Sequence, residues 1–219
     1  MTNTPSKKLV ILISGSGSNL QAFIDATQNH SLPATIAAVI SNRPGVKGLE
    51  RARKAGIQTE LIDHKQFHDR DYFDRALMNV IDRYQPDAVI LAGFMRILGS
   101  EFVTHFARKL FNIHPSLLPK YPGLHTHQRA IEAGDKEHGA TVHFVVPELD
   151  AGPAIIQARV PVYPDDDADR LAARVLEQEH RIYPLAVKWF CENRLALTDN
   201  GATLDGRLLP ATGFQFQPY

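Results

Sequence analysis

Short apolar runs alternate along the chain with segments in which apolar residues recur at helical spacing. The first run covers residues 8–14 and leads into the glycine-rich stretch 15–19. Leu20, Phe23 and Ile24 then follow at the spacing of one helix face. The chain therefore begins with a predicted strand, a tight turn and a helix.

The same alternation continues to about residue 190. Further strands are predicted at 34–41, 58–62, 88–92, 110–114, 139–146 and 154–162, and helices at 46–55, 71–84 and 167–190, the last interrupted near Pro184. These strands are continuously apolar, which is typical of a parallel sheet covered on both faces. We predict a doubly wound α/β fold with a mostly parallel sheet and helices on both faces. One domain of residues 1–219 is expected, with a flexible N-terminus at 1–7 and a C-terminal tail at about 195–219.

Composition narrows the class of protein without naming a function. Lys plus Arg and Asp plus Glu both number 24, so no net charge attracts nucleic acid or anionic lipid. No apolar run approaches the roughly 20 residues that span a bilayer. The single cysteine, Cys191, excludes an internal disulfide. A protein of the reducing cytoplasm, with no nucleic-acid or membrane partner, is expected.

The glycine-rich turn at residues 15–19 can hold an anion. Its backbone N–H groups and the helix that follows form a small cradle for a phosphate. It differs from the dinucleotide fingerprint because Leu20 occupies the third glycine position, and it lacks the lysine of a P-loop. An ordinary strand-to-helix turn, with glycine for positive φ, is the alternative.

A second candidate is the apolar segment 91–98, which carries a predicted strand past its carboxyl end. Ligands of open α/β sheets bind at that edge, and an apolar loop there suits a flat heterocycle. Packing of Phe94, Ile97 and Leu98 into the core is the competing interpretation.

The most informative stretch is 112–115. Asn112 and His114 point to the same face of a strand, so an amide and an imidazole leave its end side by side. Both groups can donate to a developing oxyanion without a metal. Asp150, between two predicted strands, can orient His114 and favour its protonated form. A buried histidine with a turn-forming Asn, and an Asp in a hairpin turn, are the alternatives.

Three further features bear on the chemistry. Glu179 falls within the buried stripe of the last predicted helix, where a carboxylate needs a partner or a function. The proline-rich segment 115–127 predicts a long functional loop. The pairs His64/His68 and His125/His127 have spacings that can share a metal. The first lacks the HExxH pattern and no acidic residue lies in register near His125, so we expect no metal.

Taken together, these motifs closely resemble the folate-dependent phosphoribosylglycinamide formyltransferases of the bacterial single-domain type. The resemblance spans about residues 8–192, and its motifs lie at 13–21, 91–98, 112–119, 121–127, 150–152 and 177–180. It implies a Rossmann-like formyltransferase fold. It also implies transfer of the formyl group of the co-substrate 10-formyltetrahydrofolate to the amino group of glycinamide ribonucleotide, in purine biosynthesis.

The resemblance also assigns roles by position. It implies Asn112, His114 and Asp150 as the catalytic residues. It places the ribotide phosphate on Gly17, Ser18 and Asn19, and the glycinamide end on Glu179. It surrounds the folate with Arg70, Met95, Arg96, Ile97, Leu98, Asn112 and the loop 147–152. A monomer or weak homodimer is expected.

Several alternatives share some of these features. Formyltetrahydrofolate hydrolase and methionyl-tRNA formyltransferase have the same Asn, His and Asp. The segment 121–127 favours the ribotide enzyme over the tRNA enzyme, and Pro115 favours it over the hydrolase. The length of the chain is also expected to leave no room for the additional domain of either. A phosphate-binding module without turnover is disfavoured by the intact trio, and a nicotinamide oxidoreductase by Leu20.

Overall fold

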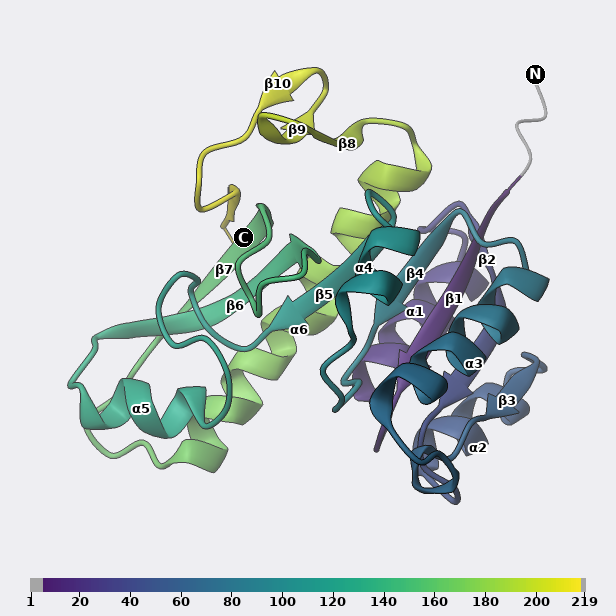
Figure 1. Cartoon of the computed structure of the whole chain (residues 1–219). Helices are drawn as coiled ribbons and strands as arrows, with labels where there is room; N and C mark the ends of the chain where they lie inside the picture. Colours follow the sequence, from purple (N-terminus) through teal and green to yellow (C-terminus); the bar gives the residue numbers. More distant parts are fainter. Residues whose placement is uncertain (1–5, 218–219) are drawn as a thin grey trace. The chain divides into compact units, whose positions relative to one another are not determined.

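A computed structural model describes residues 6–217 of the chain. The helices are α1 (Ser18–Gln28), α2 (Lys47–Lys54), α3 (Arg70–Arg83), α4 (Ser100–His105), α5 (Thr126–Glu132) and α6 (Ala168–Cys191), with a 3₁₀ turn η1 (His64–Gln66). The strands are β1 (Lys7–Ile13), β2 (Ala34–Ser41), β3 (Thr59–Leu61), β4 (Ala88–Leu91), β5 (Leu110–His114), β6 (Glu137–Phe144), β7 (Ala154–Pro161), β8 (Leu195–Thr198), β9 (Gly201–Leu204), β10 (Arg207–Leu208) and β11 (Phe214–Phe216). Figure 1 shows the ribbon with these labels.

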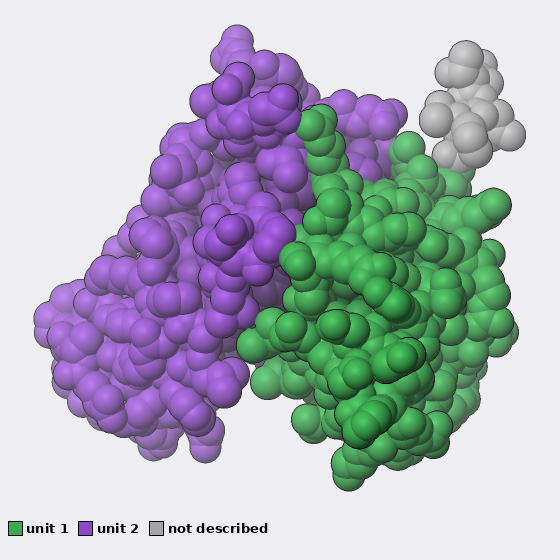
Figure 2. All heavy atoms as spheres, viewed as in Figure 1, with its two compact units in different colours: residues 1–111 green, residues 112–219 purple. Residues whose placement is uncertain are grey.

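The fold is α/β with a mostly parallel sheet flanked by helices, as the sequence predicts. The chain divides into two compact units, residues 1–111 and 112–219 (Figure 2). The single-domain boundary predicted from the sequence remains a prediction.

The first unit is built on four strands in the order β3-β2-β1-β4. β1 pairs in parallel with β2 and β4, and β2 pairs in parallel with β3. Residues 9–13 of β1 are completely buried, which explains why this strand is a continuous apolar run. Every strand predicted in this unit is present, with ends that differ by one residue at most.

In the second unit β6 pairs antiparallel with β7, and β11 pairs in parallel with β7. The helix α6 packs against both β6 and β7. The predicted interruption of this helix near Pro184 is wrong, because α6 runs without a break through Pro184. Ile182, Tyr183 and Ala186 around the proline are fully buried, so tertiary packing holds the helix where the missing N–H weakens it.

Other predictions need correction at the edges of the elements. Lys7, assigned to a flexible N-terminus, is the first residue of β1, and residues 1–5 lie outside the described part. The segment predicted as irregular to residue 127 ends earlier, since α5 begins at Thr126. The Thr126 hydroxyl donates to the Pro115 carbonyl at 2.6 Å, which ties the first turn of this short helix to the strand end.

The C-terminal tail contains regular structure. Strands β8, β9 and β10 form a small antiparallel sheet. β11 then joins β7, and Phe214 in β11 packs edge-on against Trp189 of α6 with the ring centroids 5.4 Å apart. These contacts hold the tail against the second unit.

No helix within residues 6–217 has the length and apolar character needed to cross a membrane.

Candidate active site

The end of β5 presents the amide and the imidazole predicted from the sequence. Asn112 is half-buried, and His114, two residues on, is buried at 6% exposure. The alternation of side chains along a strand places both on one side, with Ile113 on the other.

His114 lies between two acceptors. Its Nδ1 is 3.5 Å from Oδ2 of Asp150, and its Nε2 is 2.8 Å from the carbonyl oxygen of Tyr121. An imidazolium, with a donor on each nitrogen, satisfies this pair of acceptors. The expected contact between Asp150 and His114 is therefore present, and the catalytic roles of the two residues remain predictions.

Asp150 reaches His114 from a turn with unusual backbone geometry. Its φ is 53°, in the left-handed region that Asp and Asn tolerate better than most residues. The backbone N–H of Gly123 donates to Oδ2 of Asp150 at 2.9 Å, so the carboxylate is held from two directions. Asp150 therefore lies in a turn, as the alternative interpretation predicts, and its side chain also faces His114.

Asn112 has a neighbour that the sequence analysis missed. Its Nδ2 lies 3.2 Å from Nε2 of His143, while Nδ1 of His143 lies 2.9 Å from the Phe144 carbonyl. Because a carbonyl only accepts, Nδ1 carries the proton, and Nε2 accepts from the amide of Asn112. Burial lowers the pKa of His143, which keeps the ring neutral and suited to this role. The second N–H of the Asn112 amide can then serve an anionic oxygen.

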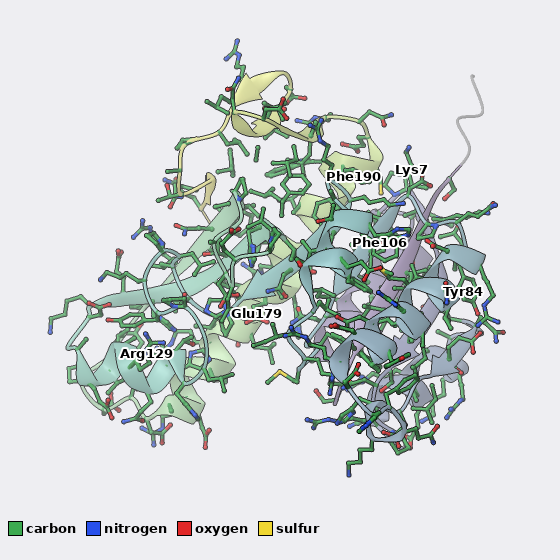
Figure 3. All side chains as sticks on the ribbon, in the orientation of Figure 1. Lys7, Tyr84, Phe106, Arg129, Glu179 and Phe190 are labelled. Carbon is green, nitrogen blue, oxygen red and sulfur yellow. The ribbon has the colours of Figure 1, made fainter. Side chains whose placement is uncertain are left out.

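Glu179 lies on α6 and is buried at 8% exposure, as the helical spacing predicts (Figure 3). Glu179 belongs to the second unit, which also contains Asn112, His114 and Asp150. Contact with a substrate remains a prediction.

The glycine-rich turn of the first unit, the predicted anion cradle, leads directly into α1. Gly17 precedes α1 with φ 70°, and no side chain caps this helix end. A Cβ on Gly17 would lie 2.7 Å from the Cα of Gly48, so both the conformation and the close approach require glycine. From α2, Arg51 donates through Nε to the Ser16 carbonyl at 2.9 Å. Ser18 and Asn19 follow as the first two residues of α1.

The apolar segment 91–98 of the same unit divides between core and surface. Leu98 is buried, whereas Met95 and Ile97 are 58% and 61% exposed. The Ser14 hydroxyl accepts from the Met95 N–H at 2.8 Å and donates to Oδ1 of Asn42 at 2.6 Å, which fixes this loop beside the end of β1. The predicted packing into the core is confirmed for Leu98 and is wrong for Ile97, while Phe94 is half-buried. Binding of a flat heterocycle by this segment remains a prediction.

The two predicted folate-binding arginines of this unit differ in setting. Arg96 stacks on the ring of Phe73 with its guanidinium carbon 4.6 Å from the centroid. Arg70 is exposed at the start of α3. Between them, Asp74 is buried, which raises the pKa of its carboxyl.

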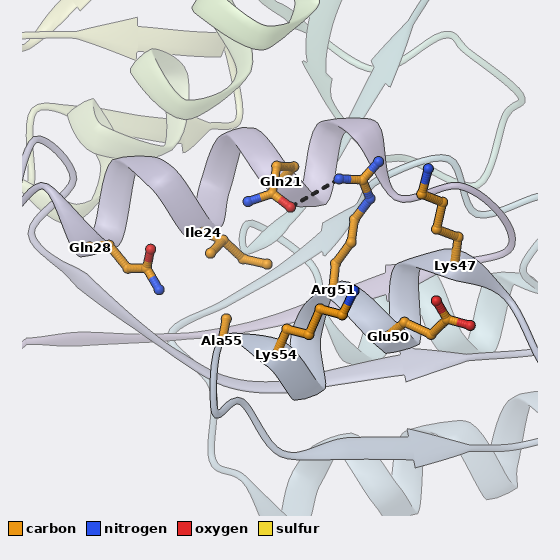
Figure 4. A pocket seen from close by; sticks show the side chains of 8 residues that line it. All are labelled: Gln21, Ile24, Gln28, Lys47, Glu50, Arg51, Lys54 and Ala55. Atoms are coloured by element: carbon orange, nitrogen blue, oxygen red, sulfur yellow. Dashed lines mark hydrogen bonds between the residues drawn. The ribbon is translucent and has the colours of Figure 1, made fainter.

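A groove of about 280 Å³ lies between α1 and α2 (Figure 4). Lys47, Arg51 and Lys54 make it basic, and Arg51 donates there to Oε1 of Gln21 at 3.0 Å. The sequence analysis did not single out this groove. Arg51 lines the groove and also donates to the Ser16 carbonyl in the glycine-rich turn.

In each histidine pair whose spacing could share a metal, one histidine contacts other residues and the other, His68 or His125, is exposed. Nδ1 of His64 contacts the Asn42 carbonyl at 2.8 Å, and the ring of His127 packs edge-on against His138 at 5.1 Å. No group of three or more possible metal ligands occurs among residues 6–217.

Comparison with known proteins identifies the family. Residues 7–187 match the formyl transferase family, and the chain belongs to it. It is 56% identical over 206 residues to the phosphoribosylglycinamide formyltransferase of Escherichia coli strain K12, an alignment that covers 94% of this chain and 97% of that protein. Identity to the Haemophilus influenzae enzyme of the same name is 50% over 208 residues, with coverages of 95% and 98%. The structure of the Coxiella burnetii phosphoribosylglycinamide formyltransferase superposes with a TM-score of 0.93 at 48% identity, covering 97% of this chain and all of that one.

Proposed function

We propose that this chain transfers the formyl group of 10-formyltetrahydrofolate to the amino group of glycinamide ribonucleotide. The observation that carries the proposal is the arrangement at the end of β5, where His114 lies between Asp150 and the Tyr121 carbonyl and Asn112 is two residues away. The family membership supplies the class of reaction, and the high identity to ribotide formyltransferases supplies the acceptor.

The reaction needs charge stabilisation and proton movement. The amine attacks the formyl carbon, and the carbonyl electron pair moves to oxygen to give a tetrahedral oxyanion. The second N–H of Asn112 donates to that oxyanion, and the positive charge of an imidazolium at His114, whose own donors face Asp150 and Tyr121, stabilises it electrostatically. The bond from carbon to the folate nitrogen then breaks, and the proton lost by the amine reaches this nitrogen. Asp150 assists this proton transfer through His114 or through water.

The binding residues implied by the resemblance complete the proposal. The amides at Gly17, Ser18 and Asn19 take the ribotide phosphate, because they form an uncapped helix N-terminus. Glu179 takes the glycinamide end. The folate contacts Arg70, the segment 95–98 and the loop 147–152, with Asn112 beside the formyl group.

The rival activity is hydrolysis of 10-formyltetrahydrofolate, in which water replaces the amine. A direct assay separates the two. Purified protein in a metal-free buffer with a chelator is given 10-formyltetrahydrofolate, with and without glycinamide ribonucleotide, and release of tetrahydrofolate is followed. We expect release only with the ribotide, matched by one formylated ribotide for each folate. Equal release without ribotide would establish hydrolysis instead, and no release under either condition would favour a binding module.

Two further proposals concern the state of the protein. We place it in the cytoplasm, where purine synthesis consumes its product, and expect a monomer or weak homodimer. Sedimentation at several concentrations tests the second.

A further inference from the structure

One loop supplies two of the backbone contacts that hold the catalytic pair. In the segment between β5 and α5, the Tyr121 carbonyl accepts from Nε2 of His114, and the Gly123 N–H donates to Oδ2 of Asp150. The loop has no helix or strand of its own. The orientation of both side chains therefore depends on whatever holds this loop in place.

The first tether of the loop is Thr141, a fully buried residue of β6. Its hydroxyl donates to the Ser116 carbonyl at 2.6 Å and accepts from the Leu118 N–H at 3.1 Å. Two backbone groups of the loop are thus fixed to one side chain of the sheet.

The second tether is Gln157 on β7, which is 1% exposed. It lies directly opposite Thr141 in the register of the antiparallel pair. Its Nε2 donates to the Leu118 carbonyl at 2.7 Å and to Oγ1 of Thr141 at 3.0 Å. One amide nitrogen therefore uses both of its hydrogens, one on the loop and one on the first tether.

We propose that Gln157 is a positioning residue for the formyl transfer. It fixes the loop 115–125, and through the loop it sets the orientation of His114 and Asp150. This inference rests on the proposed function. Gln157 touches neither residue of the pair, and its effect passes through Leu118 and Thr141 to the backbone groups of Tyr121 and Gly123.

The chemistry of the site favours an amide at this position. Methionine has similar length and volume but no N–H, so Gln157→Met would leave the buried Leu118 carbonyl without this donor. The Thr141 hydroxyl would lose one of its two donors and keep the Leu118 N–H. The loop would then relax toward other partners. Misplacement of catalytic groups by about 1 Å can cost roughly 100-fold in rate.

The test compares Gln157→Met with Val160→Ala. Val160 is buried on the opposite face of the same strand and makes no polar contact with the loop, so it controls for loss of stability alone. In Gln157→Met we expect kcat to fall about 10- to 100-fold while the KM values of both substrates change less than about threefold. Val160→Ala should keep the kcat of the wild type. An unchanged kcat in folded Gln157→Met, or an equal loss in Val160→Ala, would overturn the proposal.

A second measurement is independent of the reaction. Hydrogen exchange of the Leu118 and Gly123 amides, followed by NMR without substrates, should accelerate about tenfold or more in Gln157→Met and not in Val160→Ala. Unchanged exchange would remove Gln157 as a tether even if the rate falls. If the wild-type protein transfers no formyl group but the exchange changes as expected, the proposed function fails while the tether stands.

Discussion

At the scale of the single residue, the two amide hydrogens of Asn112 have different roles. One amide hydrogen is committed to His143, whose tautomer is fixed by the Phe144 carbonyl. The other hydrogen is the one that we propose as the donor to the oxyanion. An alanine at this position removes both.

We predict that Asn112→Ala lowers kcat by about 10²- to 10³-fold, or roughly 3 kcal/mol, as loss of one oxyanion donor does in other enzymes. The KM values of both substrates should change little. Steady-state kinetics measure this, with Asn29→Ala at the end of α1 as the control that keeps its rate. A kcat near that of the wild type would remove Asn112 from the mechanism.

Asp150 can be tested by a change that preserves its unusual backbone. Asn tolerates the φ of 53° and can still accept from Gly123, so Asp150→Asn removes only the charge beside His114. We expect kcat to fall about 10²- to 10⁴-fold while the ribotide still binds. Kinetics and calorimetric titration with the ribotide separate the two effects.

The matched control is Asp205→Asn, because Asp205 also has a positive φ, of 51°, and lies in the turn before β10. This variant should retain full activity. If Asp150→Asn does too, the carboxylate next to His114 has no electrostatic role.

At the scale of elements, the proposed phosphate cradle depends on how closely α2 approaches the turn before α1. Because a Cβ on Gly17 would meet Gly48, Gly17→Ala must push the turn away from α2. We predict an increase in the ribotide KM of about tenfold, equivalent to ~1.4 kcal/mol, with little change in the folate KM.

Gly45→Ala is the control for this prediction. Gly45 also has a positive φ, of 66°, but a Cβ there meets nothing within 4 Å. Both variants should lose about 1 kcal/mol or more of stability through backbone strain, measured by urea unfolding. Only Gly17→Ala should change the ribotide KM, and equal changes in both substrates' KM values would contradict the cradle.

At the scale of the whole molecule, buried neutral histidines make stability depend on pH. Burial, and secondarily His127, lowers the pKa of His138 to about 4, and burial lowers those of His127 and His143 as well. A folded-state pKa below the unfolded value of about 6.5 means that the unfolded chain binds more protons between these values. The stability from His138 is therefore full above pH 6.5 and is lost as pH falls toward 4.

We predict a decrease in unfolding free energy on the order of 3 kcal/mol from His138 alone across this range. Urea unfolding at pH 7.5, 6, 5 and 4 measures it. His138→Gln should flatten the dependence, whereas His68→Gln, at an exposed position, should leave it unchanged. If the unfolding free energy depends on pH equally in the wild type and in His138→Gln, His138 is not held neutral by burial.

The sequence by itself determined the parts of this protein that depend on local pattern. Continuous apolar runs predicted the strands, because a strand covered on both faces buries every residue, and helical spacing placed Glu179 on a buried face. The family followed from motifs that are short and contiguous, such as 112–119. Asp150 beside His114 was expected from the residues, but their 3.5 Å separation depends on the fold.

Only the tertiary structure decided which distant residues meet. His143 lies beside Asn112 although the two are 31 residues apart in the sequence. Gln157 lies opposite Thr141, 16 residues away, because β6 and β7 pair in one particular register. Helix α6 continues through Pro184 for a similar reason, since its buried neighbours outweigh the local penalty of proline. Local propensity contains no information about these partners. They are fixed when the burial of apolar surface selects a single arrangement of the elements.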